Sequence, residues 1–254
     1  MNGKFARRKL RLDDTLIEYS VRRSRRRKKT VQISVSGGAV VVSAPMHTPD
    51  REVQAIVQKR SGWILGKLEA DAQRPPPLPL VTGDMLPYLG REVVLVVEEA
   101  DISRCSVRLD DDSLLVVLPL GLAGDERRDA VRAALATWYR ARAAELLADS
   151  VARWLPVMSR SRPPRPERTN CNPRVLVREQ RTRWGSCSAD GTLRFSWRLA
   201  MVEPELIDSV AVHELAHLEV MDHSPAFWDV VLRAMPDAKE RRKRLGEAGR
   251  RLPL

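Results

Sequence analysis

Three histidines near the end of the chain have a spacing that suits the binding of a metal ion. The chain has four histidines in 254 residues, and His213, His217 and His223 lie within eleven positions. The first two belong to the segment HELAH, which matches the pattern H-E-x-x-H. Residues four apart on an α-helix project from one face, so two imidazoles can bind the same cation. The spacing therefore predicts a metal site on a helix, with zinc as the expected ion.

The acidic residue of the same segment is the candidate for proton transfer. Glu214 follows His213 and is therefore rotated by about 100° around the helix axis. Its carboxylate would miss the cation but could reach a water molecule bound to it. A general base must lie within hydrogen-bond reach of the proton that it removes. We predict that Glu214 is the catalytic residue and activates a metal-bound water for hydrolysis.

His223 is the candidate for the third ligand, because a catalytic zinc site takes three protein ligands and keeps one position open. On a continuous helix His223 would lie about 80° from His213 and about 120° from His217. Ser224 and Pro225 are typical of a helix cap and a first helical residue, so we expect a break near residues 221–222. His223 could then turn back toward the other two. The alternative is that the histidines are hydrogen-bonded core residues without a metal.

The elements that must position these residues follow from hydrophobic periodicity. We expect helices over residues 204–221 and 225–235, followed by a basic C-terminal helix. Before them, residues 174–180 and 192–201 should form the two strands of a hairpin with a turn at Asp190-Gly191. The second strand places four apolar residues at alternate positions, which buries one of its faces: Leu193, Phe195, Trp197 and Leu199. The pattern predicts an α+β fold.

The remaining part of the chain is predicted to be mostly strands. Segments within residues 15–45 and 91–120 have strand-like patterns, and one helix begins at Thr48 with Pro49 as its first helical residue. A long helix is expected over residues 125–155. We place the domain boundary at 122/123, between a β-rich N-terminal region (1–122) and a metallohydrolase domain (123–254). No internal repeat is apparent.

Composition limits the class of protein. Hydrophobic residues make up 43% of the chain and charged residues 30%, which is typical of a soluble globular protein. No apolar run approaches the roughly 18 residues of a membrane-spanning helix, and no secretory signal is recognisable. The three cysteines are widely spaced and form no C-x-x-C pair, so neither a disulfide framework nor a thiolate zinc site is suggested. We therefore expect a cytoplasmic protein.

The net charge of +11 is concentrated in three segments, residues 1–30, 153–183 and 233–254. Residues 1–30 alone hold 12 Lys and Arg against 3 acidic residues. The basic segment RRSRRRKK at 22–29 is the candidate for an interface with nucleic acid. No aromatic residue is interleaved there for base stacking, which argues against sequence-specific recognition of single strands. The alternative is a solvated, self-repelling loop.

Several segments together resemble the YgjP-like metallopeptidase domain family, which is related to the SprT-like proteases and to the wider group of zincins. They are Arg183–Cys187 (RWGSC), Ile207-Asp208, His213–Leu218 (HELAHL) and Asp222–Trp228 (DHSPAFW). The segments RRKKTVQISV and TGDMLPYLGREVVL are also similar, so the resemblance covers most of the chain. The family commonly has Asn at the position of Asp222 and Cys at that of Ala216, and neither is a ligand position.

The resemblance implies a zinc site formed by His213, His217 and His223, with Glu214 as the base. It also implies a zincin-like α+β fold in which an edge strand, here residues 192–199, aligns a peptide substrate by strand addition. The leading hypothesis is therefore a zinc-dependent metallopeptidase that acts on peptides or proteins. Two alternatives stay open: a zinc-dependent hydrolase of nucleotides or phosphate esters, and a zinc-stabilised nucleic-acid-binding module without catalysis.

Overall fold

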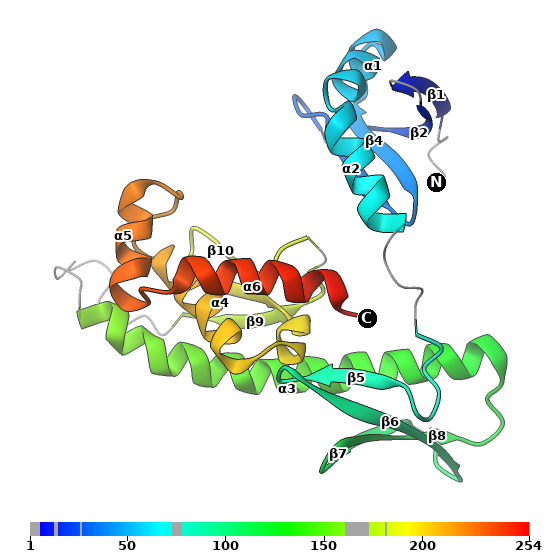
Figure 1. Cartoon of the computed structure of the whole chain (residues 1–254), viewed down its shortest axis with the longest axis vertical. Helices are drawn as coiled ribbons and strands as arrows, with labels where there is room; N and C mark the ends of the chain where they lie inside the picture. The colour runs from blue at the N-terminus through cyan, green and yellow to red at the C-terminus, as the bar shows by residue number, and fades with distance from the viewer. Residues whose placement is uncertain are drawn as a thin grey trace. The chain divides into compact units, whose positions relative to one another are not determined.

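The computed structural model describes residues 6–12, 15–25, 27–72, 78–160, 173–180 and 182–253. The chain divides into two compact units, Met1–Pro75 and Pro76–Leu254, which are drawn in Figure 1. Each unit has its own cluster of buried apolar residues. In the part of the chain that the model describes, no helix is both long enough and apolar enough to cross a membrane.

The first unit is built on a four-stranded sheet. Its strands are β1 (Ala6–Leu12), β2 (Thr15–Ser24), β3 (Gln32–Ser36) and β4 (Ala39–Pro45), in the spatial order β1-β2-β4-β3. β2 and β4 run parallel, and the two outer pairs are antiparallel. Gly37 and Gly38 connect β3 to β4 with positive φ angles of 58° and 69°, which glycine adopts without steric cost.

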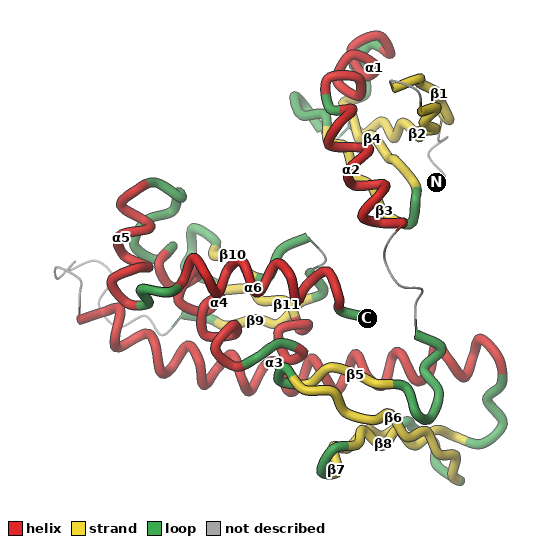
Figure 2. The backbone as a smooth tube through the Cα atoms, viewed as in Figure 1, coloured by secondary structure: helices red, strands yellow, loops and turns green. Residues whose placement is uncertain are grey.

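Two helices follow this sheet, where the sequence predicted one. α1 (Asp50–Lys59) and α2 (Ser61–Ala72) are separated at Arg60, and α1 begins one residue later than expected, with Pro49 as its N-cap. Val53, Val57 and Ile64 are buried in the same cluster as alternate residues of β2 and β4. The helices therefore pack against one face of the sheet (Figure 2).

The basic segment 22–29 lies partly in this sheet. Arg22 and Arg23 belong to β2, and Arg26 lies outside the described residues. Arg23 donates to Asp50, with 2.7 Å between Nη2 and Oδ1, and Arg27 donates to Gln32 at 2.8 Å. Part of the basic charge is thus used to join β2 to α1, and nucleic-acid binding by this segment stays a prediction.

The second unit opens with a sheet of the same topology as the first. β5 (Met85–Tyr88), β6 (Arg91–Ala100), β7 (Ser106–Asp110) and β8 (Ser113–Pro119) have the order β5-β6-β8-β7. β6 and β8 are parallel and the outer pairs antiparallel. Helices follow the fourth strand in both units. The chain therefore contains a repeat of topology that the sequence did not reveal.

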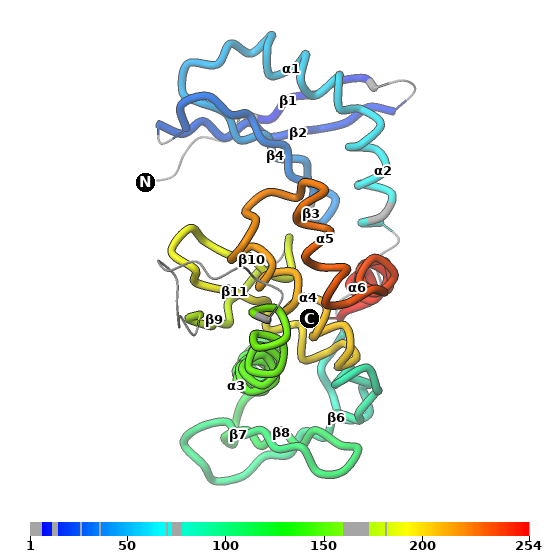
Figure 3. The backbone as a smooth tube through the Cα atoms, turned by 90° about the vertical axis from the view of Figure 1, so that its left-hand side faces the viewer, coloured from blue at the N-terminus to red at the C-terminus, as the bar shows by residue number. Residues whose placement is uncertain are grey.

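One long helix contacts both sheets of the second unit. α3 (Gly124–Arg160) has 37 residues and includes Pro156, in agreement with the helix expected over 125–155. It lies between the β5–β8 sheet and a second, smaller sheet (Figures 1 and 3). Tyr139 of α3 donates its hydroxyl to the carbonyl of Pro87 in β5 at 2.8 Å. The boundary expected at 122/123 thus falls inside this unit, between β8 and a helix that shares its core.

The smaller sheet differs from the predicted hairpin. Its strands are β9 (Val175–Arg178), β10 (Gly185–Cys187) and β11 (Leu193–Ser196), in the order β10-β11-β9. β9 and β11 are parallel, so residues 174–180 are not the hairpin partner of 192–201; the antiparallel partner is β10. A 3-10 helix, η2 (Trp197–Met201), replaces the second half of the expected strand. The predicted alternation is nonetheless reflected in burial, because Leu193, Phe195, Trp197 and Leu199 are all buried.

Three helices complete the second unit. α4 (Pro204–Ala216) packs against α3, α6 and β10. α5 (Pro225–Ala234) and α6 (Ala238–Arg251) follow it. Pro204 and Pro225 each stand at the start of a helix. A backbone N–H at that position would have no acceptor within the helix, so proline, which lacks this N–H, costs no hydrogen bond there. α4 ends five residues earlier than predicted, so His217 is its C-cap residue and does not lie inside the helix.

Candidate metal centre

α4 places two of the predicted ligands on one buried face. Leu206, Val210, Ala211 and Leu215 of α4 belong to the core of the unit, and the helix is apolar on most sides. His213 projects from this helix, and His217 stands directly after it as the C-cap residue. His217 is buried, with a relative exposure of 7%. A helix this buried holds its polar side chains in one position, because few alternative rotamers are free of clashes.

The chain turns back after α4 and brings His223 to the other two histidines. The Nδ1 of His217 lies 3.0 Å from the carbonyl oxygen of Val220. Since a carbonyl can only accept, Nδ1 carries the proton and the lone pair lies on Nε2. Asp222 then accepts a hydrogen bond from the backbone N–H of Ser224 at 3.0 Å. The predicted break before Pro225 is confirmed, and His223 lies in the corner between α4 and α5.

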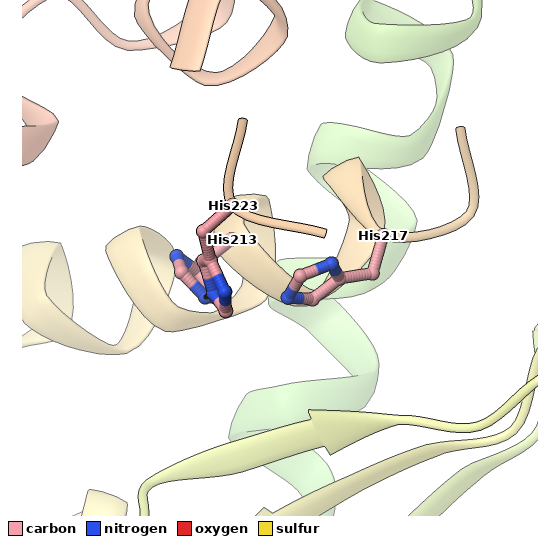
Figure 4. A group of neighbouring side chains, drawn as sticks. All are labelled: His213, His217 and His223. Carbon is pink, nitrogen blue, oxygen red and sulfur yellow. Dashed lines mark hydrogen bonds between the residues drawn. The ribbon is translucent and has the colours of Figure 1, made fainter. Parts of the chain in front are cut away.

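The three imidazoles converge. One ligand nitrogen from each of His213, His217 and His223 lies within 4.8 Å of the others, and their rings face a common point in Figure 4. The Nε2 atoms of His213 and His223 are 3.0 Å apart. A zinc–nitrogen bond is about 2.0–2.1 Å long, so three nitrogens around one ion lie roughly 3–3.5 Å apart. The donor set fits a zinc ion after small side-chain movements.

The side chain of Phe227 contacts all three histidines. Its ring centroid is 4.9 Å from that of His213, 4.5 Å from that of His217 and 4.9 Å from that of His223. Phe227 is fully buried in α5. In the sequence, Phe227 is marked only as a member of the motif DHSPAFW, which assigns it no role at the site. A buried aromatic residue on the helix after the third histidine was the signal that could have identified it.

The buried environment keeps His213 and His217 neutral. Burial lowers the pKa of His213 to about 4, and the charges of His217, His223 and Arg242 act in the same direction. Burial also lowers the pKa of His217, although its hydrogen bond to Val220 opposes the shift. Only a neutral imidazole has a lone pair for a metal. Both side chains are therefore in the ligand form at neutral pH.

Glu214 lies beside the cluster but is not one of its donors. Its side chain is buried against the backbone of Gly185 in β10, where a Cβ atom would come within 2.5 Å of Oε1. The other oxygen, Oε2, has no hydrogen-bond partner among the described residues. Burial raises the pKa of Glu214 to about 8, and the charge of Arg183 partly opposes the shift. This is the environment of a carboxyl group that exchanges a proton near neutral pH.

A cavity of about 480 Å³ gives access to the cluster and to Glu214. Its wall includes the whole of β10 (Gly185–Cys187), together with Trp184, Trp228 and Arg242. A second hollow of about 460 Å³ shares Arg183 and Ser186 with the first, so the two meet along β10. Trp184 and Trp228 pack on the core and also line this cavity. No local sequence pattern marks Arg242 as a residue of the site.

The predicted substrate strand is not at an edge. Residues 193–196 form β11, which is paired on both sides, with β10 and with β9. A strand paired on both sides has no free N–H and C=O groups for a peptide. β10, which contacts α4 and pairs only with β11 among the described strands, has an open side. The strand that could accept a substrate is therefore β10.

Comparison with known proteins places the chain in a family. The model of the YgjP-like metallopeptidase domain matches residues 29–248. Among solved structures, the metallopeptidase zymogen abylysin of Pyrococcus abyssi is 22% identical, with a TM-score of 0.36, and the match covers 42% of this chain and 99% of that chain. A comparison with curated proteins gave no match. Because the family model spans both units of the structure and most of the sequence, the chain belongs to the YgjP-like metallopeptidase family.

Proposed function

We propose that the protein is a zinc-dependent metallopeptidase in which His213, His217 and His223 hold the metal and Glu214 is the general base. The observation that supports this most directly is the convergence of three imidazoles, whose ligand nitrogens lie within 4.8 Å of one another, beside a buried carboxyl group that is not part of the donor set. When bound, zinc polarises a carbonyl group and lowers the pKa of a water molecule toward roughly 7.

Glu214 has the properties of a residue that accepts and returns a proton. With a pKa of about 8, its carboxylate can take a proton from the attacking water, and the resulting carboxylic acid can give that proton to the leaving amine. The bond that forms joins the water oxygen to the carbonyl carbon, and the bond that breaks is the peptide C–N bond. The contact with Gly185 limits where the carboxylate can lie.

β10 is the element that would align an extended peptide. Its three residues line the main cavity, and the second hollow continues past Ser186. A peptide on the open side of β10 would form main-chain hydrogen bonds along the strand, and the two hollows would receive its side chains. A glycine at position 185 leaves room for the peptide to approach the carboxyl group of Glu214 closely.

The central test is Glu214→Gln. Gln has nearly the same shape but cannot accept the proton, so we expect turnover of unfolded casein to fall by about 10²–10⁴-fold while zinc remains bound. The matched control is Glu205→Gln, because Glu205 stands on the same helix but pairs with Arg244 at 3.0 Å. Full activity of the Glu214→Gln protein would contradict the proposed role.

A hydrolase of nucleotides or phosphate esters is the second candidate. Arg183 and Arg242 both line the main cavity, and guanidinium groups bind phosphate well. Incubation with unfolded casein and with nucleoside triphosphates, each with and without chelator, separates the two candidates. We expect chelator-sensitive cleavage of casein. Chelator-sensitive loss of the triphosphate without cleavage of casein would favour the second candidate.

A further inference from the structure

The wall of the main cavity holds more basic than acidic side chains among the described residues. Apart from the histidines, its wall contains two arginines, Arg183 and Arg242, and a single acidic residue, Glu214. Glu214 is buried, and its side chain packs against the backbone of Gly185. Among the described residues, no acidic side chain of this wall forms an ion pair with either guanidinium group.

Arg183 lies where the two hollows meet. It lines both of them, two residues before β10. Its side chain is exposed, and no described residue forms an ion pair or hydrogen bond with it. Arg183 and Glu214 line the same cavity. The guanidinium group of Arg183 is thus on the cavity wall that also holds Glu214 and is open to a ligand.

Arg242 occupies another part of the wall, on α6. Its guanidinium carbon lies 5.5 Å from the ring centroid of Trp228, which also lines the cavity. Two other arginines of the same helix are paired with acids: Arg241 with Asp237 at 2.8 Å and Arg244 with Glu205 at 3.0 Å. Arg242 has no such partner in the described part of the chain. An aromatic face positions the cation without neutralising it.

We propose that Arg183 and Arg242 form a carboxylate-binding subsite beside the histidine cluster, which selects peptides with an acidic side chain or a C-terminal carboxylate next to the cleaved bond. The inference rests on the proposed function, because it assumes a peptide substrate. A guanidinium group forms two parallel, charge-assisted hydrogen bonds with a carboxylate. The same charges repel lysine and arginine side chains, so the cavity disfavours basic peptides.

The test measures binding and does not depend on turnover. Metal-free wild-type protein, kept in chelator, is titrated with pentapeptides while tryptophan fluorescence reports on Trp184 and Trp228 in the cavity wall. One pair of peptides has a central Asp or Asn between alanines, with both ends blocked. A second pair contains only alanine and ends in a free carboxylate or an amide. We expect the acidic member of at least one pair to bind about tenfold more tightly.

Variants identify the groups that recognise the charge. Arg183→Gln and Arg242→Gln should each reduce the preference for the acidic peptide, and the double variant should abolish it. Arg250→Gln is the matched control, because Arg250 is an exposed arginine of α6 that does not line the cavity. Thermal unfolding of each variant confirms that the fold is intact.

Three outcomes would overturn the proposal. The acidic and neutral peptides could bind equally, or the preference could survive in the double variant. Alternatively, tripolyphosphate could bind while the acidic peptides do not, which would assign the arginines to phosphate. Since none of these measurements requires hydrolysis or zinc, they remain informative even if the Glu214→Gln experiment contradicts the proposed activity.

Discussion

At the scale of single residues, Phe227 has the most specific position in the site. It is fully buried, and its ring lies within 5 Å of the ring centroids of all three histidines. Two of these histidines come from α4 and its C-cap, and the third comes from the turn before α5. This one rigid ring therefore restricts the rotamers of three histidines that come from separate segments, and it preorganises the candidate metal site.

The first prediction concerns this ring. Phe227→Leu should lower the affinity for zinc by about 10–100-fold, the usual cost of losing a group that orients metal ligands. Leucine is too small and too flexible to support three imidazoles at once. The measurement is a competition titration with a chromogenic chelator, and the visible spectrum of the cobalt-loaded protein reports whether the coordination is still tetrahedral.

Phe195→Leu provides the control. Phe195 is also fully buried, in β11, and it makes no ring contact with the histidines. It should reduce the stability of the fold but leave the affinity for zinc almost unchanged. An equal loss of zinc affinity in both variants would mean that Phe227 acts through general stability and does not position the ligands.

The second prediction concerns Gly185. A Cβ atom at this position would lie 2.5 Å from Oε1 and 2.7 Å from Cγ of Glu214, so Gly185→Ala must displace the carboxyl group. We expect turnover to fall by about 10²-fold, because a misplacement of about 1 Å has effects of that size. Zinc affinity should stay the same, since the cluster itself is not touched.

Gly246→Ala is the matched control for this change. Gly246 lies in α6 with no atom within 4 Å of an added Cβ, so alanine there should stabilise the helix by about 0.5–1 kcal/mol. Its turnover should equal that of the wild type. Unchanged turnover in Gly185→Ala would show that the carboxyl group can move without loss of function.

The sequence was most informative at this scale, and for a physical reason. Because residues four apart lie on the same face of a helix, the sequence alone places His213 next to His217. The Ser224-Pro225 pair marks the start of a new helix, and the turn before it brings His223 close to the other two. The contacts of Phe227, Gly185 and Arg242 with the site depend on how α5, β10 and α6 pack on α4. Such contacts join residues that are distant in the chain, and no local pattern specifies them.

At the scale of elements, the small sheet shows where sequence reasoning was wrong. Alternating apolar residues correctly placed one face of β11 in the core, but alternation says nothing about which strand is the neighbour. β10 has only three residues, too few for a recognisable pattern. The sequence predicts the turn at Asp190-Gly191 correctly, but it assigns the more distant residues 174–180 as the hairpin partner of β11. The parallel pairing of β9 with β11 moved the edge of the sheet to β10.

The third prediction belongs to the turn that joins β10 to β11. Asp190 accepts hydrogen bonds from the hydroxyl of Ser188 and from the backbone N–H of Thr192, the latter at 3.0 Å. These bonds favour the ionised form and lower the pKa of Asp190 from 3.8 to about 2. The stability that they contribute is present above about pH 3.8 and is lost as the pH falls through about 2.

An NMR titration of the side-chain carboxyl carbon of Asp190 checks this prediction. The midpoint should lie near 2 in the wild type. It should move toward 3.8 in Ser188→Ala, because the Ser188 hydroxyl is the largest cause of the shift. A wild-type midpoint near 3.8 would mean that the turn is open in solution and does not hold β10 in the register seen here.

At the scale of the whole molecule, the two four-stranded sheets have the same order and directions of strands and are followed by helices. The segments share few identical residues, so no repeat is apparent in the sequence. Topology can be kept while side chains change, because it depends on the apolar alternation that buries one face. The two copies differ in their helices: α1 and α2 are short and separate, while α3 has 37 residues and also packs against α4, which carries two of the candidate ligands at its end.

The fourth prediction follows from the two separate cores. All three candidate ligands lie in the second unit, so zinc should stabilise that unit alone. Scanning calorimetry of the zinc-loaded protein should show two transitions, and chelator should lower only one of them. At a free zinc concentration of 100 times Kd, the stabilisation is about 2.7 kcal/mol. That corresponds to a shift of roughly 5–10 °C for a unit of this size.

His217→Ala assigns the transitions. His217 is the most buried of the three histidines and its Nδ1 is held by Val220, so its loss should remove the zinc response of the second unit. The other transition, which belongs to the first unit, should keep its temperature in every condition. If chelator shifted both transitions together, the two units would unfold as one cooperative body, and zinc bound in the second would stabilise the first as well.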